Sequence, residues 1–123
     1  MKDGKKYEWI QEDEFNKYWK LAQKAGNGFE VINQRWTPNY AAIEAGFTVH
    51  NSAGEAKYSS ILIVFEGHTN NIVVKRLRLF NENDGDIGYR DVVGCYDEWT
   101  NALDGGLDSL QDFINKQRQG AMS

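Results

Sequence analysis

The hydrophobic periodicity of this chain changes from helical to alternating near residue 26, and this change limits the folds open to it. Between Glu12 and Ala25 the bulky side chains recur every three or four residues, a spacing that places them on one face of an α-helix. Gly26-Asn27-Gly28 then ends the helical pattern, because glycine adopts the left-handed conformation of a helix C-cap without steric cost. Beyond it, apolar and polar residues alternate, as they do in half-buried β-strands. We therefore expect an amphipathic helix followed by a sheet.

Four alternating segments follow, joined by short polar turns. They are Phe29–Trp36, Tyr40–His50, Tyr58–Glu66 and Ile72–Asn81. The second segment alternates most cleanly, with a shared apolar face of Ala41, Ile43, Ala45, Phe47 and Val49. In the third, both faces carry apolar residues, so both are expected to be at least partly covered. Short turns between successive strands predict antiparallel pairing in a meander.

Residues 87–96 admit two interpretations. Asn83-Asp84-Gly85-Asp86 contains the Asp-Gly pair of a tight hairpin, which favours a fifth strand over Ile87–Tyr96. That strand would carry one face made of Ile87, Tyr89, Val93 and Cys95. The alternative is a loop and then a helix that begins near Asp91. We favour the hairpin.

Helical spacing returns after Asp97, in a pattern made of Trp99, Leu103, Gly106, Leu110, Phe113 and Gln117. Gly105-Gly106 interrupts this pattern, which predicts either one helix with a weak middle or two short helices, the second capped by Asp108. The expected architecture is an α+β domain. It consists of an N-terminal helix, a four- or five-stranded antiparallel meander and a C-terminal helix or two short ones, with the helices on one face of the sheet.

The length and composition fit a single domain over residues 1–123. Hydrophobic residues make up 41% of the chain, which is enough for a packed core. No apolar run approaches the roughly 18 residues that cross a bilayer. The charged start, Met1 to Lys6, differs from an apolar signal core, and one cysteine cannot form an internal disulfide. We therefore expect a cytoplasmic protein that does not associate with membranes.

The acidic residues gather in the last third of the chain. Residues 81–123 hold nine acidic side chains and three basic ones, although the net charge of the whole chain is only −4. Such a field repels a nucleic-acid backbone and attracts a basic protein surface. A protein partner is therefore favoured over duplex nucleic acid.

Few side chains suit catalysis near neutral pH. His50, His68 and Cys95 are the available groups, and no cluster has the spacing of a zinc site. A thiolate nucleophile formed by Cys95 and His50 competes with the simpler interpretation of a strand cysteine and a surface histidine. The oxygen-rich segment Asn81–Asp86 lacks the glycine and glutamate of a calcium loop, so a turn is favoured there. The sequence predicts no enzyme, no cofactor and no metal site.

Two arginines on the fourth strand form a first candidate site. Arg76 and Arg78 are two residues apart and share a face with Val74 and Phe80. If the helices pack on the other face, these arginines could bind a phosphate, and aromatic residues such as Trp36 or Tyr40 could stack on a base. This predicts a site for a nucleotide-like anion or a short single strand. The alternative is cross-strand ion pairing with neighbouring glutamates, namely Glu30, Glu44 or Glu66.

A second candidate site lies on the last helix. Asp104, Asp108 and Asp112 are four residues apart, so they project along one side of a helix. Like charges at this spacing cost roughly 0.2 to 0.5 kcal/mol per pair in an isolated helix. The array could dock a basic partner, while the alternative is an ordinary solvated helix face. The function we expect is that of a non-enzymatic interaction protein, an inhibitor or adaptor that binds another protein through this acidic surface.

An aromatic segment precedes the first helix. Tyr7, Trp9 and Ile10 could anchor in a groove of a neighbouring subunit or of a partner protein. The segment therefore makes a homo-oligomer plausible.

Overall fold

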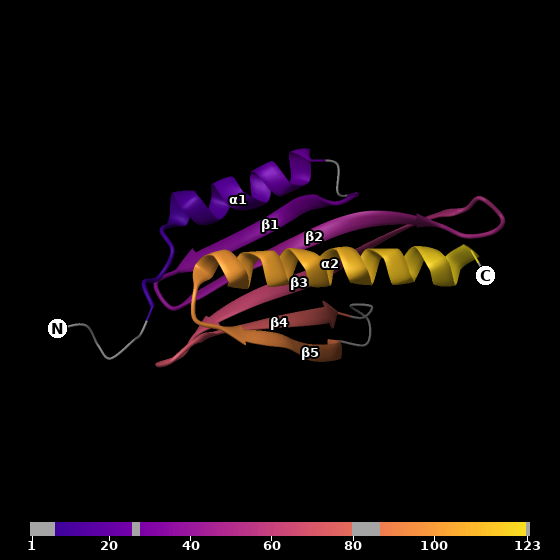
Figure 1. Cartoon of the computed structure of the whole chain (residues 1–123). Coiled ribbons are helices and arrows are strands. Elements are labelled where there is room, and N and C mark those ends of the chain that lie inside the picture. The colour runs from indigo at the N-terminus through magenta and orange to yellow at the C-terminus, as the bar shows by residue number, and fades with distance from the viewer. Residues whose placement is uncertain (1–6, 26–27, 80–86, 123) are drawn as a thin grey trace.

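Over the residues that the structure describes, the protein has an α+β fold of two helices and a five-stranded sheet, as predicted (Figure 1). A computed structural model describes residues 7–25, 28–79 and 87–122. The elements in chain order are α1 (Glu12–Lys24), β1 (Glu30–Thr37), β2 (Tyr40–His50), β3 (Ala56–Gly67), β4 (Ile72–Leu79), β5 (Ile87–Tyr96) and α2 (Trp99–Met122). Neither described helix has a stretch long and apolar enough to cross a bilayer.

The sheet is an antiparallel meander in which each strand pairs with the next along the chain. Its order is β1-β2-β3-β4-β5, so β1 and β5 are the two edge strands. The predicted fifth strand is confirmed, and the alternative of a helix that begins near Asp91 is wrong. The predicted Asp84-Gly85 turn lies outside the described residues.

Both helices lie on the same face of the sheet, which we call the covered face (Figure 1). Phe15 of α1 contacts the ring of Phe65 edge-on, with the two ring centroids 5.6 Å apart. Gly106 of α2 approaches Phe65 and Ile63 of the same face. The core therefore sits between the helices and the inward-facing residues of the central strands. Its β2 and β3 members are Ala41, Ile43, Ala45, Phe47, Ile61, Ile63 and Phe65.

The helix α2 runs unbroken through Gly105 and Gly106, so the two-helix alternative is wrong. A Cβ atom on Gly106 would lie 3.0 Å from Cζ of Phe65 and 3.1 Å from Cγ2 of Ile63. A Cβ atom on Gly105 would collide with the hydroxyl of Tyr96. The two glycines therefore allow α2 to approach the sheet closely, and they do not end a helix.

Each edge strand contains a register shift. In β1 the shift falls between Val31 and Asn33, and in β5 the first of two shifts accompanies Val93, which has no counterpart on β4. As a result Val93 packs against the core, whereas Cys95 pairs with Val73 and is exposed. The expectation that Val93 and Cys95 share one face is therefore wrong, because a bulge changes the alternation of the strand.

The segment before α1 folds onto the core of its own chain. Tyr7 and Ile10 are buried, and the Tyr7 hydroxyl donates a hydrogen bond of 2.7 Å to the carbonyl oxygen of His68. Trp9 donates through Nε1 to the carbonyl oxygen of Thr37 at 2.8 Å. The expectation of a free tail that anchors in a neighbouring subunit is therefore wrong.

Candidate functional site

Arg76 and Arg78 lie on the covered face, against α2. Arg76 pairs with Ile63 in the sheet, and its Nη1 donates to the carbonyl oxygen and to the hydroxyl of Ser109, at 2.9 and 3.1 Å. The guanidinium carbons of Arg76 and Arg78 lie 5.4 and 5.3 Å from the centroid of the Phe113 ring. The expectation that these arginines stand on an open face is wrong, because α2 covers the face that they share with Val74.

Trp36 and Tyr40 are on opposite faces of the sheet, so the four residues of the expected anion site do not come together. Trp36 pairs with Ala41 on the covered face, and its indole Nε1 donates to the carbonyl oxygen of Ile10 at 3.0 Å. Tyr40 pairs with Glu66, whose face points away from the helices. Only Tyr40 of the four therefore lies on the face opposite the helices.

The expected partners of the arginines are also wrong. Glu30, Glu44 and Glu66 lie on the face opposite the helices, where they accept hydrogen bonds from Tyr58, Ser60 and Lys75 respectively. The ion-pair partner of Arg76 is instead Asp91 of β5, with Nη2 3.2 Å from Oδ2. Sequence reasoning missed Asp91, because its position opposite Arg76 depends on the shifted register of β5.

Asp104, Asp108 and Asp112 are all exposed along the outer side of α2, where the spacing places them. Four residues turn a helix by about 40° more than one full turn, so each carboxylate is rotated slightly around the helix axis from the one before it. Asp104 lies on the α1 side and accepts a hydrogen bond of 2.9 Å from the hydroxyl of Tyr18. Asp112 forms an ion pair of 3.1 Å with Lys116, one turn further along the helix. Their role in binding stays a prediction.

The charge of these aspartates reaches α1. Burial raises the pKa of the Tyr18 hydroxyl, and the hydrogen bond to Asp104 and the negative charges of Asp104 and Asp108 raise it further. A phenolate at this position would lose solvation and face two carboxylates. Tyr18 therefore stays protonated and donates its hydroxyl to Asp104 across the gap between the two helices.

A hollow of about 480 Å³ extends the acidic region from α2 to β5. It is lined by Arg76, Asp91, Val92, Val93, Tyr96, Gly105, Asp108, Ser109 and Asp112. The guanidinium of Arg76 already bonds to Ser109 and Asp91, so three carboxylates share this hollow with one engaged cation. We call the residues Asp91, Asp104, Asp108 and Asp112 the acidic surface.

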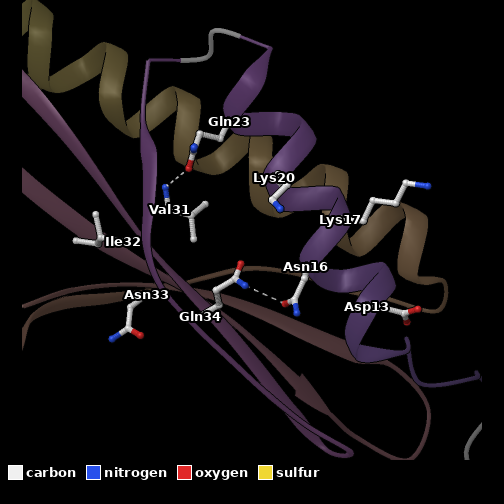
Figure 2. Close-up of a pocket in the computed structure, with 9 residues that line it drawn as sticks. All are labelled: Asp13, Asn16, Lys17, Lys20, Gln23, Val31, Ile32, Asn33 and Gln34. Carbon is white, nitrogen blue, oxygen red and sulfur yellow. Dashed lines mark hydrogen bonds between the residues drawn. The ribbon is translucent and has the colours of Figure 1, made fainter.

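A larger hollow, of about 800 Å³, separates α1 from β1 (Figure 2). Two hydrogen bonds span it. The Val31 N–H donates to Oε1 of Gln23 at 2.6 Å, and Nε2 of Gln34 donates to Oδ1 of Asn16 at 3.1 Å. These amide groups hold the helix against the edge strand. The hollow is therefore first of all a contact between α1 and β1.

The sheet face opposite the helices has an apolar centre that no described element covers. We call this the open face. Leu62 and Leu77 are directly paired at its centre, and Val64 beside them is 3% exposed. Next to this centre Lys75 and Glu66 form an ion pair of 2.9 Å. Sequence reasoning assigned the arginines to such a face, whereas the leucines occupy it.

The candidate nucleophile and base lie far apart. Across the sheet, Cys95 pairs with Val73, Val73 with Glu66, and Glu66 with Tyr40, so Cys95 lies level with the first residue of β2. His50 is the last residue of the same strand. At about 3.4 Å per residue, ten residues of β2 separate these ends by roughly 34 Å. Within the described ranges no three His, Cys, Asp or Glu side chains group as metal ligands, and the segment Asn81–Asp86 lies outside those ranges.

Comparisons of the chain with protein-family models, with curated proteins and with solved structures gave no match.

Proposed function

We propose that this chain is a protein-binding module, an inhibitor or adaptor, that docks a basic partner on its acidic surface. The observation that supports this proposal is the exposure of Asp104, Asp108 and Asp112 on the outer side of one continuous helix. In the described part of the chain, Lys116 is the one cation that forms an ion pair with any of the three.

Repulsion among Asp104, Asp108 and Asp112 favours a basic partner. Like charges one helical turn apart each lower helix stability by roughly 0.2 to 0.5 kcal/mol in isolated helices. Lysine or arginine side chains of a partner would remove this repulsion and would also be attracted to the surface during diffusional encounter. The hollow beside Asp91, Asp108 and Asp112 offers space for one such side chain.

The helix that carries the aspartates is packed against the sheet and bonded to it near its middle. Gly106 brings α2 into contact with Phe65, and Arg76 bonds to Ser109 in the middle of the helix. A surface that is already ordered loses little conformational entropy when a partner binds. The acidic surface is therefore suited to binding without rearrangement.

The test is the affinity for a partner that has been captured with the wild-type chain and identified. Asp108→Lys and Asp112→Lys should each raise the dissociation constant about tenfold or more, because each places a positive charge against a basic surface. Calorimetric titration at several salt concentrations measures this, and affinity should fall as salt rises.

Glu8→Lys is the matched control, since Glu8 is an exposed acid outside the acidic surface. It makes the same change in net charge and should leave the affinity nearly unchanged. Salt-insensitive binding, or equal losses in Glu8→Lys and Asp108→Lys, would contradict the proposal. An anionic ligand would need Arg76 and Arg78 to face solvent, whereas both lie against α2.

A further inference from the structure

The open face has a composition unlike that of a sheet face in water. Antiparallel sheets with one solvated face usually carry polar residues on it. Here the centre of the face is apolar, and no described element lies over it. Its apolar members are Ala42, Leu62, Val64, Val73, Leu77 and Val92. Ala42 and Val64 are already buried by their neighbours, so covering the face would remove from water mainly the remaining apolar surface of Leu62, Val73, Leu77 and Val92.

The extent of the open face can be compared with the area that stable interfaces bury. Five strands spaced about 4.8 Å apart span roughly 19 Å, and the nine residues from Tyr58 to Glu66 span roughly 27 Å. The flat extent is then about 500 Å², and side chains corrugate it into a larger accessible surface. Stable interfaces bury about 800 Å² per partner. The flat extent falls short of this value, so a stable contact would use the whole face together with the relief of its side chains.

The charges of the open face suit a second copy of the same chain. Arg35 and Lys75 stand among Glu44 and Glu66, so both signs are present, and a second copy is not repelled by a field of one sign. The acidic surface of α2 is on the other side of the molecule. Two copies packed by their open faces would hold their acidic surfaces more than about 30 Å apart, far beyond the screening length of about 8 Å.

The edges of the sheet are poorly suited to the other common mode of sheet association, the addition of a strand. Both edge strands have register shifts, at Val31/Asn33 in β1 and around Val93 in β5. In β1, the Val31 N–H is also engaged by Gln23 of α1. Bulges and covered edges are the features by which sheets avoid edge-to-edge pairing. Association through the face is therefore favoured over association through an edge.

We propose that the open face is the interface of a symmetric dimer, in which a second copy of this chain packs its own open face against the first. The contact is isologous, so each leucine of one copy meets the corresponding apolar centre of the other. Two sheets packed in this way form the middle of a four-layer assembly with the helices outside. The two acidic surfaces point outward and stay accessible, so one dimer presents two of them.

The test is the mass of the purified chain in solution, measured by sedimentation equilibrium from about 1 to 500 µM. The wild type should approach twice 14.1 kDa at the upper concentrations. Leu77→Lys and Leu62→Lys should each raise the dissociation constant of the dimer at least about tenfold, because each buries a charge at the centre of the interface. Circular dichroism confirms that each variant is folded.

The matched control is Leu21→Lys, since Leu21 is 57% exposed on α1, away from the open face. This variant should dimerise like the wild type. Should the leucine variants fail to fold, Val92→Lys replaces them, because Val92 pairs with Lys75 and is 62% exposed. A wild type that stays monomeric at about 500 µM, or a dimer that persists in folded Leu77→Lys or Val92→Lys, would overturn the proposal. Asp108→Lys should leave the mass unchanged, so this proposal and the proposed function fail independently.

Discussion

Arg76 of β4 bonds to Ser109 in the middle of α2 through a single nitrogen. Its Nη1 lies 2.9 Å from the carbonyl oxygen of Ser109 and 3.1 Å from the hydroxyl oxygen. Nη2 of the same guanidinium pairs with Asp91 of β5 at 3.2 Å, and the arginine side chain is only 15% exposed. One side chain therefore joins two strands and the helix that covers them, which is a structural role.

Arg76→Ala should lower the free energy of unfolding by about 2 to 3 kcal/mol. The substitution removes charge-assisted hydrogen bonds and leaves the carbonyl oxygen of Ser109 without this donor in a partly buried position. Urea denaturation followed by tryptophan fluorescence measures the change. Lys20→Ala, which removes a positive charge from the exposed side of α1, should change the stability by less than about 0.5 kcal/mol. Equal stability of the two variants would show that the bonds to Ser109 contribute nothing.

The positions of the strands and helices could be predicted because periodicity depends on local sequence. Alternation in Tyr40–His50 shows which residues share a face, and all of its predicted inward residues do face the helices. Alternation does not show which face the helices cover. Val74 and Arg76 were correctly placed on one face, yet that face was wrongly expected to be open. Only the packing of α2 on Ile63 and Phe65 decides this.

The sequence also predicted the three aspartates of α2 better than it predicted their neighbours. The exposure of Asp104, Asp108 and Asp112 followed from a spacing within one helix, which is local information. Their neighbours did not follow, because Tyr18 comes from a distant helix and Asp91 from a strand with a shifted register. The apolar centre of the open face also needed the pairing of Leu62 with Leu77 across two strands.

Gly105→Ala and Gly106→Ala form a pair of substitutions that separates helix propensity from packing. Each should gain up to about 1 kcal/mol of helix propensity. At Gly105 the new methyl group displaces the end of the Tyr96 side chain, whereas at Gly106 it presses on Phe65 and Ile63 in the core. We expect Gly106→Ala to be less stable than Gly105→Ala by about 1 to 2 kcal/mol. Thermal denaturation compares the two, and equal stability would mean that α2 can move away from the sheet without loss.

The Tyr18 hydroxyl should ionise at higher pH than an ordinary tyrosine, because burial and the carboxylates of Asp104 and Asp108 raise its pKa. The raised pKa stabilises the fold fully below the ordinary tyrosine value of about 10, and this contribution is lost as pH rises above it. In a titration followed by phenolate absorbance, Asp104→Asn should move the most alkaline step to lower pH. Tyr18→Phe should remove that step, and Tyr40→Phe should leave it in place. An unchanged step in Asp104→Asn would contradict the contact.

The ion pair between Glu66 and Lys75 should make stability depend on pH in acid. The hydrogen bond from Lys75 lowers the pKa of Glu66, burial opposes this shift, and His68 adds to it. A lowered pKa stabilises the folded state above the ordinary glutamate value of about 4.3, and the contribution is lost as pH falls through the lowered value. Glu66→Gln should therefore be less stable than the wild type near pH 7, by up to about 1 kcal/mol, and the difference should vanish in stronger acid. Melting temperatures measured from pH 7 downward test this, with Glu8→Gln as the exposed control. A difference that stayed constant into strong acid would mean that the ion pair does not hold Glu66 in its charged form.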